Sequence, residues 1–353
     1  MENAFTKLVG IQNPIILAPM AGGPSTPELV AAVSNAGGLG SLGGNYLSPE
    51  GLAAEIQKVK SLTSQPFAVN LFVPYEPAQP AAKETQEMLD YTNDLRRKLG
   101  LTPLEKIPPT KNNFEEQMNV VLTERPPVFS FTLGLLRTHY LRDLKNAGIK
   151  TIGTATTLEE ALQLQDSGVD AITLQGFEGG GHRGVFFGHQ DFEIPLFTLL
   201  ESVRGRIKVP VIAAGGLMTG FDIHKSLAAG ASAAQLGTAF LLCKEAGTSK
   251  CYRDALLSHS PQKHTEITDA FSGHRARGLL NQFMKEFKAK SKRPLPFPIQ
   301  NTLTQDIRKK SAELGISDYC SLWAGAAFDQ LNHSRNEIGA ADLLHTLVGE
   351  MSP

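Results

Sequence analysis

The sequence predicts an α/β protein built on a (β/α)8 TIM barrel, and two observations carry this prediction. Short apolar or β-branched runs recur along the 353-residue chain, and a helix-like segment follows most of them. There are eight such runs, which is the strand count of a closed barrel. An open doubly wound sheet is the structural alternative, and the count of eight favours the barrel.

The predicted strands alternate with helices that begin at recognisable capping residues. Thr26 followed by Pro27, and Ser48 followed by Pro49, each supply an N-cap hydroxyl and a proline for the first helical position. Residues 157–160 have the sequence of a capping box. The eight strands are expected at residues 15–18, 39–41, 67–70, 128–131, 150–153, 170–174, 211–214 and 233–236.

Two long segments interrupt this repeat and divide the chain. Residues 1–73 and 128–245 are assigned to the barrel, and residues 74–127 to a helical insertion after the third strand. Residues 246–353 are expected to form a helical C-terminal segment that covers the barrel. We expect both additions to cover one end of the barrel rather than to form a core of their own.

Composition excludes several classes of function. Hydrophobic residues make up 41% of the chain, enough for a large core. The formal net charge is −1, so no basic excess favours nucleic acid or an anionic membrane surface. Three cysteines without a C-x-x-C pair, and no apparent signal peptide or membrane span, predict a cytoplasmic protein. No histidine cluster has the spacing of a metal site.

Candidate binding residues follow the strands, where a TIM barrel has its active site. A glycine pair, residues 215–216, follows the seventh strand, and a glycine–threonine pair, residues 237–238, follows the eighth. Such turns let backbone N–H groups approach a phosphate. Alternatively, the glycines are there only to form tight turns and bind no ligand. Asn70 and Gln175 end the third and sixth strands. Their side-chain amides could bond the edge of a flavin or a nucleobase, or could be hydrogen-bonded to other protein groups inside the barrel.

The loop after the sixth strand is the most distinctive feature, because half of residues 175–184 are glycine and they flank a single His182–Arg183 pair. A glycine-rich backbone can lie flat against a planar ligand, and histidine can act as a base or a hydrogen-bond donor near neutral pH. We therefore predict that His182 is catalytic. Two segments, starting at Gly38 and Gly179, match the G-x-G-x-x-G motif of dinucleotide-binding domains. Neither has the strand–turn–helix context that such a site needs, so we do not predict a Rossmann domain.

Five motifs in order along the chain make it resemble the nitronate monooxygenases, formerly called 2-nitropropane dioxygenases. The opening motif is QNPIILAPMAGGPST at residues 12–26, continued by NAGGLG, and VNLFVP follows at residues 69–74. The remaining motifs are GGHRG at residues 180–184, AAGG with QLGT around the seventh and eighth strands, and SLWAG at residues 321–325. The chain departs from the family pattern at two places. Gly179 stands where alanine is usual, and Thr219, in the turn after the seventh strand, stands where an acidic residue is common.

The resemblance implies an FMN-dependent enzyme that oxidises alkyl nitronates with O2 to a carbonyl compound and nitrite. It implies His182 as the catalytic residue and a small-molecule substrate as the partner, and it leaves open a homodimer. The cofactor residues that it implies are Met20, Asn70, Gln175, Gly180, Gly181, Gly215, Gly216, Gln235, Leu236, Gly237 and Thr238.

Two other enzyme functions stay open at this point, and a non-catalytic binding protein is a more distant third. NAD(P)H-dependent flavin reductases of the enoyl-ACP or quinone type share the first and fourth motifs, although Arg183 stands where the enoyl reductases are typically apolar. A flavin-free barrel lyase or isomerase acting on a phosphorylated substrate is the other alternative. Arg275 and Arg277 could reach the FMN phosphate or a substrate carboxylate, or could simply lie at the surface.

Overall fold

The computed structural model describes residues 2–110, 112–258, 263–290, 293–331 and 333–351. Within these residues the main sheet has eight parallel strands, ordered β1-β9-β8-β6-β5-β4-β3-β2. A bridge between Ile16 and Leu39 then brings the first and last of them side by side, which closes the circle. The predicted TIM barrel is therefore confirmed. Its strands are β1 Ile15–Leu17, β2 Gly40–Gly43, β3 Phe67–Phe72, β4 Val128–Thr132, β5 Lys150–Ala155, β6 Ala171–Gln175, β8 Val211–Ala214 and β9 Ala233–Leu236.

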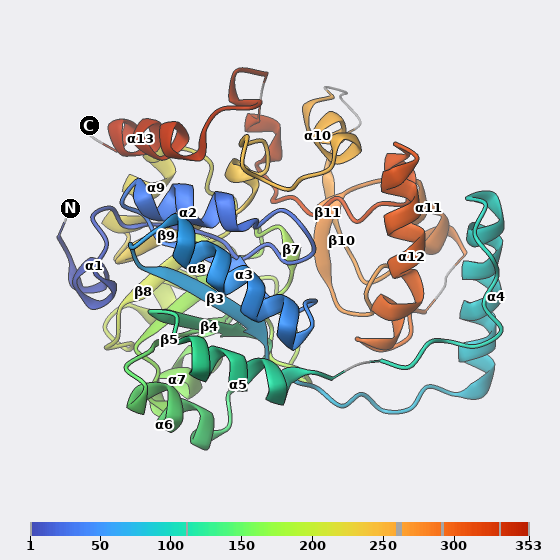
Figure 1. The fold of residues 1–353 in the computed structure, drawn as a ribbon, viewed down its shortest axis with the longest axis horizontal. Coiled ribbons are helices and arrows are strands. Elements are labelled where there is room, and N and C mark those ends of the chain that lie inside the picture. The colour runs from blue at the N-terminus through green and yellow to red at the C-terminus, as the bar shows by residue number, and fades with distance from the viewer. Residues whose placement is uncertain (1, 111, 259–262, 291–292, 332, 352–353) are drawn as a thin grey trace.

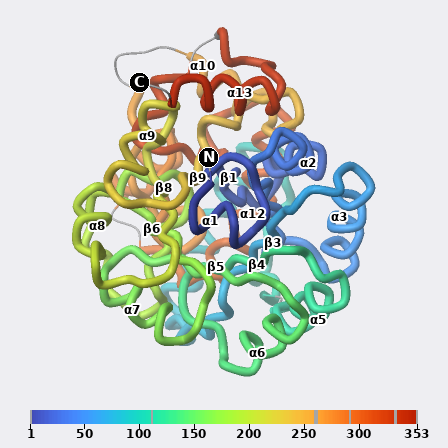
Figure 2. Tube along the Cα trace, turned by 90° about the vertical axis from the view of Figure 1, so that its left-hand side faces the viewer, coloured from blue at the N-terminus to red at the C-terminus, as the bar shows by residue number. Residues whose placement is uncertain are grey.

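A ring of helices surrounds the strands, and helix α1 (Ala4–Val9) lies across the N-terminal end of the barrel (Figure 2). Phe5 of α1 is fully buried against the first residues of the strands. The ring helices are α2 Pro27–Asn35, α3 Pro49–Leu62, α5 Phe114–Glu124, α6 Thr138–Asn146, α7 Leu158–Ser167, α8 Leu196–Val203, α9 Gly220–Ala228 and α13 Ala340–Glu350. Thr26 and Ser48 cap α2 and α3 as predicted, each accepting a backbone N–H with its side chain.

Two of these ring helices correct the predicted division of the chain. Helix α5 belongs to the expected insertion, yet its apolar face joins the barrel core between α3 and α6. Helix α13, the end of the expected C-terminal segment, packs between α2 and α9. Both therefore occupy ordinary barrel positions, after the third and the eighth strand. The additions proper are the chain between β3 and α5, and the chain between β9 and α13.

These two additions meet in an outer lobe beside the barrel (Figure 1). We use this name for α4 (Ala82–Lys98), β10 (Thr265–Thr268), β11 (Ala276–Leu279), α11 (Gln282–Ala289) and α12 (Ile299–Glu313). Apolar side chains of α4, α11 and α12 form a hydrophobic cluster separate from that of the barrel. The expectation that the additions have no core of their own is thus wrong.

Two local predictions also need correction. The C-terminal segment is not wholly helical, because β10 and β11 pair as an antiparallel hairpin. The capping box at the start of α7 forms only in part: Thr157 accepts the N–H of Glu160, but the Glu160 carboxylate bonds Thr156 and the N–H of Phe186 instead. Glu160 thereby fastens the chain that follows His182.

The remaining elements are short or connect the barrel with the lobe. They are β7 Gly181–His182, α10 Lys250–Leu257 and the 3-10 turns η1 Thr238–Phe240, η2 Ser317–Tyr319, η3 Phe328–Gln330 and η4 His333–Arg335. Among the described residues, none of the helices combines the length and the apolar character needed to cross a membrane. Residue 111 of the predicted insertion, and residues 259–262, 291–292, 332 and 352–353 of the predicted C-terminal segment, lie outside the described residues.

Candidate active site

The turns after β8 and β9 form a backbone cradle at the C-terminal end of the barrel. Gly215 and Gly216 have φ angles of +122° and +71°, a region that residues with a side chain rarely adopt. A Cβ atom on Gly216 would lie 2.9 Å from the Cβ of Glu178 in the neighbouring loop. Glycine is therefore required at this turn for conformation and for space.

Backbone donors in this cradle are available to a ligand. Within the described chain, the N–H groups of Gly216 and Thr238 make no hydrogen bond to protein. A cavity of about 290 Å³ lies in front of Gly215 and Gly216, with Leu217 and Ala326 also in its wall. Of these two donors the Gly216 N–H lies in the cavity wall, and an unpaired N–H in a glycine turn suits an anion such as phosphate.

The glycine loop after β6 is pressed against the segment that precedes η3. A Cβ atom on Gly180 would lie 2.5 Å from the backbone nitrogen of Gly325. The Gly325 N–H in turn donates to the Thr238 hydroxyl over 2.9 Å, and the Ala326 N–H donates to the Glu178 carbonyl over 2.9 Å. These contacts join the His182 loop to the cradle.

His182 is positioned by a strand pairing between the barrel and the outer lobe. Gly181 and His182 form β7, which pairs antiparallel with Ala276 and Arg277 of β11. The His182 ring contacts Phe72 from the barrel, with centroids 5.7 Å apart, and Trp323 at 5.6 Å. The two parts of the protein therefore share the walls of the histidine pocket.

The electrostatic setting keeps the His182 imidazole neutral. Burial, together with neighbouring His274 and the positive charge of Arg308, lowers the pKa of His182 to about 3. Burial likewise lowers the pKa of His274, whose ring stacks on His182 at a centroid distance of 5.9 Å. At neutral pH both rings are therefore uncharged, and each has one ring nitrogen without a hydrogen.

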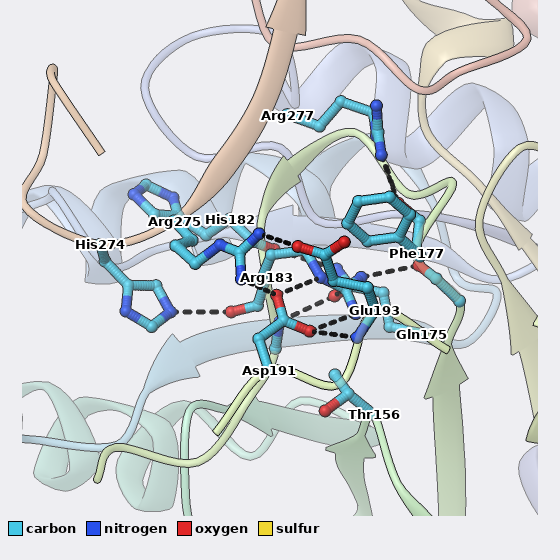
Figure 3. Close-up of polar contacts among 12 residues, drawn as sticks. Thr156, Gln175, Phe177, His182, Arg183, Asp191, Glu193, His274, Arg275 and Arg277 are labelled. Atoms are coloured by element: carbon cyan, nitrogen blue, oxygen red, sulfur yellow. Dashed lines mark hydrogen bonds and ion pairs between the residues drawn. The ribbon is translucent and has the colours of Figure 1, made fainter. Parts of the chain in front are cut away.

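The side chain of Arg183 points away from His182 into a buried polar network (Figure 3). It bonds Asp191 through Nε and Nη2, at 3.1 and 3.3 Å, and bonds the Gln175 Oε1 atom through Nη1 at 3.0 Å. Burial alone would raise the pKa of Asp191, but the hydrogen bond and the charge of Arg183 outweigh it and hold this pKa below its ordinary value. Arg183 thus holds the loop in place from behind.

Gln175 is engaged in the same network. Its Oε1 atom also accepts the N–H of Gly184 at 2.7 Å, and its Nε2 atom donates to the His182 carbonyl at 3.0 Å. Two lone pairs and one of two amide hydrogens are thereby used. One N–H remains for a ligand, so the predicted role of Gln175 toward a cofactor is narrowed to a single donated hydrogen bond.

Asn70 and Met20 approach the barrel mouth from the other side. The Asn70 Nδ2 atom donates to the Ser130 hydroxyl at 2.9 Å, and among the described residues its Oδ1 atom has no hydrogen-bond partner. Met20 follows β1 and lies next to Gly237, where a Cβ atom would be 3.6 Å from the Met20 sulfur. Gln235 is partly exposed at the end of β9, whereas the side chain of Leu236 is buried in the core.

Arg275 and Arg277 both lie in the network behind the His182 loop (Figure 3). Arg275 forms ion pairs with Glu193 and, at 3.5 Å, with Asp191. Arg277 lies over the Phe177 ring at 4.5 Å and donates to the Phe177 carbonyl. Ion pairs and a stacked aromatic ring thus occupy the two guanidinium groups.

Three residues at this site were missed by the sequence prediction, namely Ser272, His274 and Trp323. The His182 Nε2 atom lies 2.9 Å from the Ser272 hydroxyl. His274 Nε2–H donates to the Arg183 carbonyl at 2.8 Å. No local signal marks Ser272 or His274, because β7 and β11 come together only in the folded chain. Trp323 is the chain's single tryptophan and stands in the SLWAG motif, which could have indicated it.

Comparisons with known proteins give the family. The chain matches the family model described as nitronate monooxygenase over residues 2–350. A probable nitronate monooxygenase of Staphylococcus haemolyticus is 40% identical over 328 residues, which cover 92% of this chain and 91% of the relative. One of Bacillus subtilis is 36% identical over 352 residues, or 99% of each chain.

Solved structures agree with this relationship. A nitroalkane oxidase from Streptomyces ansochromogenes matches with a TM-score of 0.90 and 36% identity, covering 99% of this chain and 98% of that one. FabK from Thermotoga maritima matches with a TM-score of 0.76 and 26% identity, covering 99% and 96%. The chain therefore belongs to the nitronate monooxygenase family.

Proposed function

We propose that this protein binds FMN and oxidises alkyl nitronates with O2, giving a carbonyl compound and nitrite. The observation that carries the proposal is a histidine in an aromatic pocket, next to a glycine cradle that opens on a cavity of about 290 Å³, in a chain of this family. Trp323 contacts His182, and Gly325, two residues on, bonds Thr238 in the cradle. Two residues span at most about 7 Å, so one ligand can reach both features.

Several groups of the chain suit FMN. The N–H groups of Gly216 and Thr238 would hold its phosphate, and the remaining amide groups of Asn70 and Gln175 would bond the edge of its ring. Met20 would lie against the ring beside β9. When bound, FMN supplies the electron-transfer chemistry, while the protein binds and orients the reactants.

His182 would act on the substrate in one of two ways. Toward a neutral nitroalkane, its uncharged imidazole would accept the proton of the α-carbon. Toward a nitronate, it would orient the nitro group. The anion that forms on proton removal favours a charged imidazolium beside it, so the pKa of His182 would rise as the proton arrives. Phe72, Phe297 and Trp323 around the ring offer apolar walls for an alkyl chain.

The first experiment is to identify the cofactor and the product together. We expect the purified protein, as isolated or after incubation with FMN, to show flavin absorption bands. We expect heat-released cofactor to have the mass of FMN, and an alkyl nitronate added in air to yield nitrite. A colourless protein that does not take up FMN would contradict the proposal and favour the flavin-free lyase or isomerase.

An NAD(P)H-dependent flavin reductase is the second candidate. The structural match to FabK keeps this alternative in view, at lower identity than the match to the nitroalkane oxidase. Anaerobic mixing with NADH or NADPH separates the two functions. Rapid loss of the flavin bands would favour the reductase, whereas little change is expected for a nitronate monooxygenase.

A further inference from the structure

Ser272 of the outer lobe contacts the ring of the proposed catalytic histidine, His182. It is fully buried in the turn between β10 and β11. Its hydroxyl oxygen lies 2.9 Å from His182 Nε2, 3.0 Å from the carbonyl oxygen of His274 and 3.3 Å from the backbone nitrogen of His274. Three polar groups therefore converge on one hydroxyl.

Counting hydrogens decides how these groups are arranged. A serine hydroxyl carries one hydrogen and can accept two hydrogen bonds. The His274 carbonyl can only accept, so the Ser272 hydrogen points to it. The His274 N–H donates to Ser272, which leaves one lone pair for His182. That lone pair is satisfied only if His182 Nε2 carries a hydrogen.

We propose that Ser272 is a positioning residue that fixes His182 as its Nε2–H tautomer and so leaves Nδ1 as the atom that accepts a proton from substrate. The inference rests on the proposed function in one respect, namely that His182 acts on the substrate. The tautomer itself does not depend on that function.

The surrounding structure keeps Ser272 in place. The adjacent Gly273 N–H donates to the Asp269 carbonyl at 2.7 Å, which closes the turn. Pairing of β11 with β7 sets the distance from this turn to His182. A bond from His274 to the Arg183 carbonyl ties the same turn to the His182 loop a second time. Ser272 is therefore fixed relative to the ring before any substrate binds.

A direct test reads the tautomer of His182 in the flavin-loaded protein. Nitrogen-15 NMR of histidine-labelled protein distinguishes an Nε2–H from an Nδ1–H imidazole, and a His182→Gln sample assigns the signal. We expect the Nε2–H form in the natural protein and a mixture in Ser272→Ala. A dominant Nδ1–H form in the natural protein would overturn the proposal, and this readout stands even if a variant fails to fold.

Kinetics provide the second readout. A neutral nitroalkane requires proton removal, whereas a preformed nitronate does not. In Ser272→Ala we expect kcat for the nitroalkane to fall about tenfold, the effect of losing one such hydrogen bond, with KM and the rate with nitronate nearly unchanged. Ser272→Thr keeps the hydroxyl and should restore the rate.

The matched control is Thr304→Val. It removes a buried hydroxyl that bonds the carbonyl of Phe271, the residue next to Ser272, and it should leave both rates unchanged. If Ser272→Ala lowered the rates with nitroalkane and nitronate equally, Ser272 would have a structural role only, and the inference would be overturned. Absence of nitrite from the natural protein with either substrate would instead refute the proposed function, while the NMR result would still decide the tautomer.

Discussion

The barrel and the outer lobe contribute to the same site by different means. On the barrel side the proposed cofactor groups include backbone N–H groups in turns whose conformation depends on glycines such as Gly215 and Gly216. On the lobe side the contribution comes from side chains of a β-hairpin, including Ser272 and His274, which support His182 and its loop from behind. We therefore expect the two regions to respond differently to substitution, because the cradle depends on space and conformation, whereas the histidine pocket depends on hydrogen bonds and packing.

The largest expected effect is at His182, where the two regions meet. His182→Gln should lower kcat for neutral nitroalkanes by roughly 10²–10⁴, the usual contribution of a general base, while the flavin spectrum is retained. Steady-state nitrite assays measure it. His139→Gln, which alters an exposed histidine on the barrel, is the control. Unchanged turnover in His182→Gln would remove this residue from the mechanism.

The separate core of the outer lobe predicts that the lobe can be loosened alone. Phe283→Ala removes a buried ring of that core and should cost about 3–5 kcal/mol. Hydrogen exchange should speed up in α4, α11 and α12 while β4 to β6 keep their protection. The control, Phe221→Ala, truncates a barrel side chain that is 67% exposed and should change neither region. Equal loss of protection in the barrel would mean that the two cores unfold as one unit.

A smaller effect is expected in the cradle. Gly216→Ala places a Cβ in a left-handed conformation and against Glu178. Holding this conformation costs an alanine about 1–2 kcal/mol more than a glycine, and we propose that FMN binding requires it. We expect roughly tenfold weaker FMN binding in a fluorescence titration. The control is Gly168→Ala. Gly168 has a similar φ of +89°, but a Cβ atom there would meet no other atom within 4 Å, and the residue lies at the end of α7, so FMN binding should be unchanged.

The smallest effect concerns pH. Because the pKa of His182 is lowered on folding, the unfolded chain binds more protons below about pH 6.5. The stability from the neutral ring is complete above that pH and declines as pH falls toward the folded pKa of about 3. Between pH 7 and pH 6 the loss is ~0.7 kcal/mol. Denaturant unfolding should show this loss in the natural protein and in His139→Gln, and a smaller loss in His182→Gln, where the lowered pKa of His274 still contributes. The same pH dependence in all three would contradict the burial of a neutral His182.

The fold was predictable because its signals are local. Eight short apolar runs and helix starts such as Thr26–Pro27 specify barrel units without reference to distant residues. The division into two cores was not predictable from the sequence. Helices α4 and α12 are joined by contacts between residues about 200 positions apart, as in the bond from Arg96 to Asp306. Helix α13 was missed as a barrel element for the same reason.

The site divides in the same way. Glycine turns and the His182 loop stand out in the sequence because their composition is unusual. Ser272 and His274 do not, since their role depends on the pairing of β7 with β11. Arg183 was noticed from the sequence, but its burial against Asp191 could be known only from the fold.

Nitrite release from an alkyl nitronate in air, with O2 consumption followed in the same sample, is the decisive measurement for the proposed reaction. We expect the flavin-loaded protein to form nitrite and a carbonyl compound as O2 disappears, without NADH or NADPH. Absence of nitrite from a fully flavin-loaded sample, with O2 unchanged, would contradict it.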